Sequence, residues 1–519
     1  MSFFRRLPYC HFILVTVLLV VASQLSAAEN MALRSALKSI TAESLQSHVN
    51  VLADDSLEGR RAGTRGGRAA AAYLTKQLQQ LKLKGAGDRD GYYQTFGGGM
   101  RNILAVLPGT DKKLKDRYII VSAHYDHVGY GEDGNTRGGI GYIHNGADDN
   151  ASGTSGLVEV AKALVSLDRS PRRSILFAFW DGEEKGLLGS RHWMNAPTRP
   201  LKNVDLMINL DMIGRLRSKG LEVGGARTSD GLRRLVSRHN QQLDIAIRFN
   251  WKIKRNSDHF PFYEAGIPYL MFHTGLHDDY HHPNDDANKI NADGMQRVAR
   301  LIAGVAHGLA DHEDRRRFRS QAQYESPWNR KRRFRPIQPM PGRFGVRWTA
   351  GDKAENGLRL TRILDDTPAM SAGLIAGDRI IKIAGVRVTS VPQFRSLLLA
   401  SPTPATILIE RKGEEKPITK SVPLKGSPVR VGFSWRMDNA NPGMAVLVRV
   451  VPGSPADLAG LKVHDRIYQM GGKPLVDSDD LLSRAKSLTK PTELVIERKG
   501  RKSTVIIKPV VLASISKEK

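Results

Sequence analysis

The stretch that decides the fold is Ile119-Ile120-Val121-Ser122-Ala123-His124-Tyr125-Asp126, an apolar run that ends in polar side chains. Such a run predicts a short buried strand. Residues 157–164 have helical spacing, and residues 175–180 and 206–210 form two further apolar runs. Strands that alternate with helices predict an α/β domain, in which a mainly parallel sheet is covered by helices on both faces.

Polar residues follow each of these predicted strands. His124 and Asp126 end the first run, residues 181–184 follow the second, and Asp211 follows the third. The carboxyl ends of parallel strands meet at one edge of a sheet, and ligands bind there. We therefore expect these side chains to lie close together.

Residues 1–28 have the pattern of a cleavable export signal. Arg5 and Arg6 precede an apolar stretch at residues 12–22, and the small residues Ser26-Ala27-Ala28 follow it. The stretch is shorter than the roughly 20 residues that a membrane-spanning helix needs. We therefore expect an exported protein, periplasmic or secreted after cleavage.

Cysteine content and charge exclude several classes of protein. The only cysteine, Cys10, lies within the predicted signal. The mature chain would then lack disulfides and thiolates, which excludes cysteine proteases, thiolate zinc sites and iron–sulfur clusters. The formal net charge is +27, and residues 315–335 hold nine Arg or Lys against the single acid Glu325. For an exported chain, this density predicts contact with an anionic surface, and no nucleic-acid partner is expected.

The composition changes twice along the chain. Residues 38–312 carry the strand–helix alternation, and residues 313–341 have the Arg-, Gln- and Pro-rich composition of a linker. The remainder repeats with a period of 87 residues, so that Gly345-Val346-Arg347-Trp348 recurs as Gly432-Phe433-Ser434-Trp435. We therefore expect two small β-rich domains, at residues 342–426 and 429–513.

Acidic and imidazole side chains cluster in motifs of the first region. The motif residues are His124 with Asp126, Asp149, Glu183 with Glu184, Asp211, and His281. Carboxylates and imidazoles without thiolates suit zinc in an open catalytic site. Five ligands from such a set are too many for one catalytic zinc with three protein ligands, but they fit two metals that share a bridging carboxylate. Asp148 is an alternative to Asp149, and His282 is an alternative to His281.

These motifs resemble the co-catalytic di-zinc aminopeptidase family, which also contains glutamate carboxypeptidase-like enzymes and glutaminyl cyclases. The resemblance covers roughly residues 38–310. The matching stretches are SAHYDH (122–127), GADDNASG (146–153), DGEE (181–184), NLDMIG (209–214) and YHHPND (280–285), with LEGR (57–60) and YQTF (93–96) upstream.

The resemblance implies a role for each motif residue. Asp149 would bridge two zinc ions, His124 and Asp211 would complete one site, and Glu184 and His281 would complete the other. The family spacing to Asp285 favours His281 over His282, and its motif favours Asp149, the second acid. The remaining implied roles are those of general base for Glu183, of orienting His124 for Asp126, and of donor to the oxyanion for Tyr280.

The implied function is zinc-dependent hydrolysis of N-terminal residues from peptides or proteins by a metal-bridged water. Two alternatives remain. One is glutaminyl cyclisation or carboxypeptidase cleavage by the same family. The other is a peptide-binding protein whose peptidase domain is inactive.

The two repeats resemble PDZ domains, which implies binding of peptide C-termini. Residues 345–348 and 432–435 lie where the carboxylate-binding loop of such domains would be. Both lack the second glycine of the usual loop. Docking of a substrate or partner is expected, and a spacer role is the alternative.

Overall fold

The computed structural model describes residues 31–132, 134–338, 342–349, 353–510 and 512. The chain divides near Pro327 into two units. The predicted export signal and Cys10 lie outside the described residues. Across the part of the chain that is described, no helix is both long enough and apolar enough to cross a membrane.

The described residues of the first unit form a nine-stranded sheet with the order β1-β3-β5-β4-β6-β9-β7-β8, and β2 pairs with β3. The strands are β1 (Lys84–Gly85), β2 (Tyr93–Phe96), β3 (Met100–Leu107), β4 (Tyr118–His124), β5 (Ser174–Trp180), β6 (Val204–Leu210), β7 (Leu221–Gly224), β8 (Ile247–Phe249) and β9 (Tyr269–His273). Strands β5, β4, β6 and β9 run parallel, whereas β3 and β7 pair with them in the antiparallel sense. The predicted α/β fold is confirmed, and its sheet is mixed.

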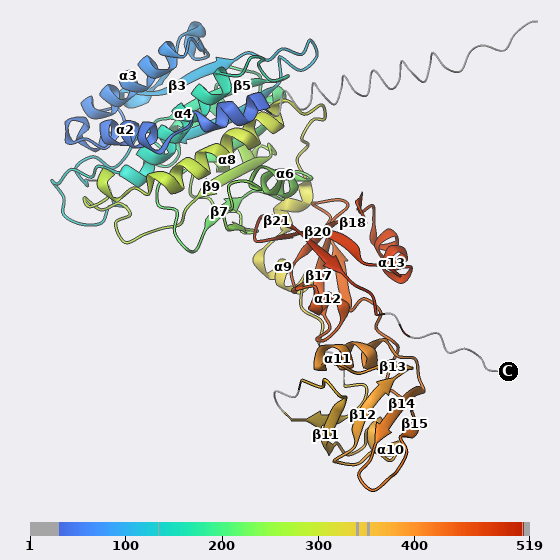
Figure 1. Cartoon of the computed structure of the whole chain (residues 1–519). Coiled ribbons are helices and arrows are strands. Elements are labelled where there is room, and N and C mark those ends of the chain that lie inside the picture. The colour runs from blue at the N-terminus through green and yellow to red at the C-terminus, as the bar shows by residue number, and fades with distance from the viewer. Residues whose placement is uncertain (1–30, 133, 339–341, 350–352, 511, 513–519) are drawn as a thin grey trace, which may run out of the picture. The chain divides into compact units, whose positions relative to one another are not determined.

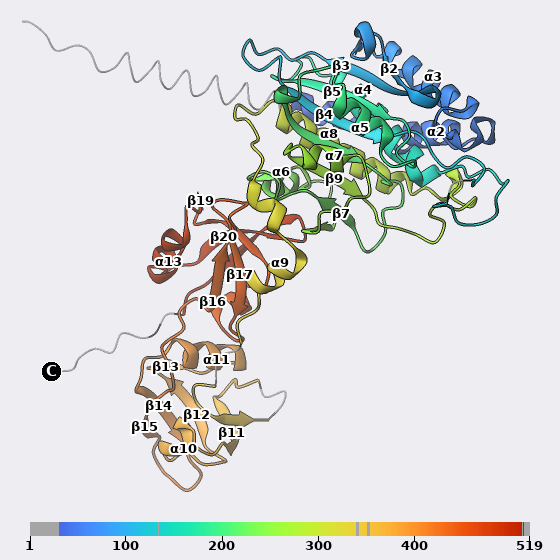
Figure 2. The ribbon, with the colours of Figure 1, turned by 180° about the vertical axis from the view of Figure 1, so that it is seen from behind.

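Helices cover both faces of this sheet. The helices are α2 (Ala42–Leu52), α3 (Arg65–Gln80), α4 (Gly153–Val165), α5 (Leu188–Asn195), α6 (Leu232–His239), α7 (His259–Glu264) and α8 (Ala292–Ala310). Alternate residues of each strand point to opposite faces. Ile119 and Val121 of β4 therefore join a core with α2, α3, α4, α6 and α8, whereas Ile120 joins a second core with Trp193 of α5 and Phe262 of α7. Figures 1 and 2 show these two faces in turn.

The register of the central strands brings their carboxyl ends together. His124 at the end of β4 lies beside Trp180 at the end of β5, and Ser122 lies beside Asn209 of β6. Residues 181–184 and Asp211 therefore leave the sheet next to His124. The predicted convergence at one edge follows from this register.

The second unit contains two antiparallel sheets. The first consists of β10 (Val346–Trp348), β11 (Leu358–Ile363), β12 (Arg379–Ile383), β13 (Val386–Arg387), β14 (Ala405–Glu410) and β15 (Ile418–Val422), with α10 (Pro368–Ser371) and α11 (Val391–Ala400). The second consists of β16 (Phe433–Met437), β17 (Ala445–Val450), β18 (Arg466–Met470), β19 (Lys473–Pro474), β20 (Thr492–Arg498) and β21 (Arg501–Ile507), with α12 (Pro455–Leu458) and α13 (Ser478–Lys486).

Each of the two sheets contains an equivalent ion pair between an arginine and a buried aspartate. Arg411 Nε lies 2.8 Å from Asp378 Oδ1, and Arg498 Nη2 lies 2.6 Å from Asp465 Oδ2. Both aspartates are buried, and each also accepts a hydrogen bond from a backbone N–H three residues before it. Each pair therefore ties a strand end to the turn that precedes the neighbouring strand.

The segment predicted as a basic linker starts against the first unit. Arg315 Nε donates to Asp205 Oδ1 at 2.9 Å, and Arg319 Nη2 donates to Glu325 Oε1 at 3.3 Å. A 3₁₀ turn, η7 (Ser320–Tyr324), and a short helix, α9 (Pro327–Arg333), follow. The ion pairs thus hold the start of the segment, before its regular structure begins.

Candidate metal centre

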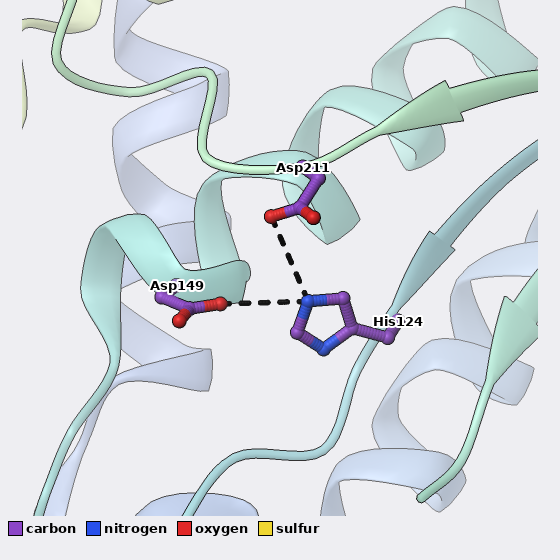
Figure 3. Close-up of side chains that lie close together, drawn as sticks. All are labelled: His124, Asp149 and Asp211. Atoms are coloured by element: carbon purple, nitrogen blue, oxygen red, sulfur yellow. Dashed lines mark ion pairs between the residues drawn. The ribbon is translucent and has the colours of Figure 1, made fainter. Parts of the chain in front are cut away.

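One group of donors gathers at the carboxyl edge of the sheet. His124 is the last residue of β4, Asp211 follows β6, and Asp149 lies in η4, the turn Ala147–Ser152 before α4. Figure 3 shows the three side chains pointing toward one another: His124 Nε2 lies 3.4 Å from Asp149 Oδ1 and 3.8 Å from Asp211 Oδ1. All three side chains are buried. They could hold one metal ion.

A second group lies beside the first and shares Asp149. His281 Nε2 lies 3.0 Å from Asp149 Oδ2 and 3.1 Å from Glu184 Oε2. His127 Nδ1 lies 2.8 Å from Glu184 Oε1, and His127, Asp149 and Glu184 could hold a second ion. The two oxygens of Asp149 therefore face different groups. This is the arrangement expected of a bridging carboxylate.

The turn before α4 selects Asp149 rather than Asp148. Asp148 points away from both groups, since its Oδ1 accepts from Gly214 N at 2.7 Å and its Oδ2 contacts His277. Gly146 opens the turn at φ +56°, and a Cβ there would lie 2.4 Å from the His127 ring. A side chain at this position would displace His127 and Asp149 together.

His281 likewise lies in the second group, and its neighbour does not. His282 Nδ1 accepts from Asn284 N at 3.1 Å instead. The ring of Tyr280 stacks on His281 with centroids 3.9 Å apart, and burial followed by the nearby carboxylates raises the pKa of Tyr280. A neutral phenol beside the centre is able to donate a hydrogen bond.

The carboxylate of Asp126 accepts hydrogen bonds from the turn that carries Glu183 and Glu184. Its Oδ1 accepts from Glu183 N at 3.0 Å, its Oδ2 accepts from Glu184 N at 3.4 Å, and Oδ1 also lies 3.7 Å from His124 Nδ1. The carboxylate thus sets the positions of adjacent residues that face different ways. Burial and the charge of Glu184 raise the pKa of Glu183 well above its ordinary value, although His124 opposes this.

The electrostatics of the cluster fit a cation. Burial and Asp149 act to raise the pKa of Glu184, but His127 and His281 lower it to about 2. Burial opposes protonation of His281, yet Asp149 and Glu184 raise its pKa to about 11. His281 Nε2 is buried and makes no well-directed hydrogen bond. A ring nitrogen that faces two carboxylates in this way is suited to bind a divalent ion together with them.

Two residues at the centre were not predicted as site residues. His127 is the last residue of the SAHYDH stretch, and its place in that motif was the available signal. Asn135 carried no signal: its Nδ2 donates to Glu184 Oε2 at 3.2 Å, and its carbonyl oxygen lies 2.8 Å from His281 Nδ1. Asn135 therefore contacts two candidate ligands of the second group, Glu184 and His281.

Comparisons with known proteins agree with this architecture. Residues 102–306 match the model of peptidase family M28, and residues 359–411 and 421–497 match models of the PDZ domain. Aminopeptidase YwaD of Bacillus subtilis is 30% identical over 223 residues, which cover 41% of this chain and 45% of that protein. Leupeptin-inactivating enzyme 1 of Streptomyces exfoliatus is 26% identical over 249 residues, which cover 48% of this chain and 49% of that protein. The matches thus span about half the length of these relatives.

A similar solved structure is the LapA aminopeptidase of Legionella pneumophila, with 20% identity and a TM-score of 0.46, covering 55% of this chain and 75% of that one. A glutaminyl cyclase of Bacteroides thetaiotaomicron has 20% identity and a TM-score of 0.42, and the match covers 52% of this chain and 98% of that one. The family models confirm the resemblance drawn from the motifs. The chain therefore carries a peptidase family M28 domain, followed by two PDZ domains.

Proposed function

We propose that the protein is a zinc-dependent aminopeptidase that removes N-terminal residues from peptides. The single observation that carries the proposal is that Asp149 faces two donor groups through different oxygens, at 3.4 Å from His124 and 3.0 Å from His281. The family model and the names of the relatives, aminopeptidase and leucine aminopeptidase, support the same reaction.

The residues that would hold two zinc ions are His124 and Asp211 for one, Glu184 and His281 for the other, and Asp149 for both. Bound zinc lowers the pKa of water toward neutrality and polarises a carbonyl.

The chain's own residues would then move the protons. Glu183 accepts a proton from the attacking water and returns it to the leaving amine. Burial, which raises the pKa of Glu183, suits a group that must both take and release a proton. Asp126 holds the backbone N–H of Glu183 and so fixes the base beside the centre. Tyr280 donates a hydrogen bond to the oxyanion.

The test is hydrolysis of aminoacyl chromogenic substrates and peptides by the metal-loaded protein, with metal content measured in parallel. We expect about two zinc ions per chain, release of free N-terminal residues and loss of activity on chelation. A cyclised product from N-terminal glutamine would assign the chain to the other reaction of its relatives. An intact peptide retained on a metal-free protein would leave only a binding role.

The PDZ domains are proposed to dock peptides. Strand β16 lies at the edge of its sheet, and a cavity of about 860 Å³ is lined by Phe433 and Trp435 of β16 and by Leu482 and Ala485 of α13. An extended peptide can add to such an edge, and its docking would raise the local substrate concentration.

Export and contact with an anionic surface complete the proposal. Residues 1–28 support export, and N-terminal sequencing of protein recovered outside the cytoplasm would test cleavage. Lys331, Arg332 and Arg335 are exposed in and after α9. These cations fit an anionic membrane or wall polymer, and salt-dependent binding to such a surface would test this.

A further inference from the structure

The upstream motif Leu57-Glu58-Gly59-Arg60 has no role in the proposed chemistry, yet it ends in a fully buried cation. Arg60 is 1% exposed. Its Nε donates to Tyr125 O at 2.9 Å, its Nη1 donates to Leu52 O at 2.5 Å and to Asn145 O at 2.7 Å, and its Nη2 donates to Gly146 O at 2.9 Å. In the described part of the chain, the guanidinium makes no ion pair with a carboxylate.

The carbonyls that Arg60 binds belong to the segments that carry the candidate ligands. Tyr125 lies between His124 and Asp126, and Asn145 and Gly146 lead into the turn that presents Asp149. The backbone joins the same contact, because Arg60 O accepts from His127 N at 3.2 Å. One side chain therefore connects the strand end that holds His124 with the turn that holds Asp149.

The backbone around Arg60 is shaped for this contact. Glu58, Gly59 and Arg60 all have positive φ, at 49°, 61° and 48°. A positive φ at two non-glycine residues, one on each side of a glycine, is costly, and such conformations persist only where their surroundings hold them. A Cβ on Gly59 would lie 2.5 Å from His144 O, so the turn also packs tightly against the loop after β4.

A buried guanidinium without an ion pair is expensive unless charge nearby offsets it. Burial lowers the pKa of Arg60 to about 10, and the carboxylates of Asp149 and Asp126 are the largest opposing influences. The side chain is therefore charged at neutral pH. Its planar fork reaches four carbonyls at once, which a lysine ammonium does not reproduce.

We propose that Arg60 is a positioning residue for the candidate metal centre, setting the spacing between His124 and Asp149 through the carbonyls of Tyr125, Asn145 and Gly146. It touches neither substrate nor metal. The inference rests on the proposed function only in that a divalent metal binds here.

The test compares two equally buried arginines. Arg60→Lys keeps the charge and removes the fork. Arg173→Lys is the control: Arg173 is also 1% exposed and also donates to carbonyl oxygens, but it pairs with Asp205 and precedes β5, at the amino edge of the sheet. For wild type and both variants, we would measure zinc affinity by competition with a chelator, the absorption spectrum of the Co²⁺ form, and thermal unfolding of the metal-free protein.

We expect Arg60→Lys to bind zinc about ten- to one-hundredfold more weakly and to show an altered Co²⁺ spectrum, as for losses of residues that orient metal ligands. Arg173→Lys should unfold at a lower temperature with a zinc affinity within about twofold of wild type. Wild-type affinity and spectrum in folded Arg60→Lys would overturn the inference.

Failure of the proposed metal site would look different, because wild type itself would then bind no zinc. If Arg60→Lys does not fold, Arg60→Gln takes its place in the same measurements. If neither variant folds while Arg173→Lys does, Arg60 serves folding rather than the metal centre, and the inference is wrong.

Discussion

His281 Nε2 lies 3.0 Å from Asp149 Oδ2, although 132 positions (281 minus 149) separate the two residues in the chain. The other oxygen of Asp149 faces His124 at 3.4 Å. Asp149 is therefore the one side chain common to both donor groups, so its removal should affect the whole centre.

Asp149→Ala should lose both metal ions together, because only two of the proposed ligands would remain for each ion: His124 and Asp211 for one, Glu184 and His281 for the other. Metal content by atomic spectrometry checks this. Asp148→Asn is the control: the amide oxygen can still accept from Gly214 N, and metal content should stay at the wild-type level. Retention of one ion per chain by Asp149→Ala would contradict bridging.

Glu183→Gln should keep its metal and lose activity. The amide has nearly the shape of the acid but cannot accept a proton, so kcat should fall about 10²- to 10⁴-fold. Glu184→Gln is the comparison, and it should lose metal from the second group. Near-normal turnover by Glu183→Gln would exclude Glu183 as the base.

Asn135→Ala should weaken metal binding at the second group alone. The amide donates to Glu184 Oε2, and losing such an orienting contact typically costs about ten- to one-hundredfold in metal affinity. Thr136→Ala is the control from the same loop, since its hydroxyl donates to Gly131 O and not to a candidate ligand. Equal metal affinities in the two variants would show that metal binding depends on the loop as a whole and not on the Asn135 amide.

Leu482→Glu should impair turnover of long peptides only. Leu482 lines the cavity beside β16 and is 39% exposed, so the substitution places a charge in the groove at little cost to folding. The value of kcat/KM should fall for long peptides and stay unchanged for aminoacyl chromogenic substrates. An unchanged value for both would favour a spacer role for this PDZ domain.

Glu159 in α4 should make stability depend on pH in the acid range. Burial acts to raise the pKa of Glu159, but hydrogen bonds from His48, Ser44 and Lys162 lower it below the ordinary value. A lowered folded pKa means that the stabilisation is present above the unfolded pKa of about 4.3 and is lost as pH falls through the folded pKa.

Thermal unfolding of the metal-free Glu159→Gln variant and wild type would check this. The wild type should be more stable at pH 7, and the difference should shrink as pH falls below about 4.3. A difference that stays constant down to pH 3 would contradict the assignment.

Local patterns were enough to predict much of the centre. The apolar runs that became β4, β5 and β6 each ended in a motif residue, and parallel packing then required His124, Glu184 and Asp211 to meet. The sheet's antiparallel edges were not predictable in this way. Strand direction depends on how the chain crosses between strands, which hydrophobic periodicity does not record.

The sequence by itself determined the order of buried strands and helices, the two C-terminal domains and the set of carboxylates and imidazoles, because these depend on residue type and short-range spacing. Only the tertiary structure decided that His127 and Asn135 contact Glu184, and that Arg60 binds the segments carrying His124 and Asp149. The first two contacts depend on how loops place side chains from distant segments. The contacts of Arg60 go to backbone carbonyls, and a backbone carbonyl has no signature in the sequence.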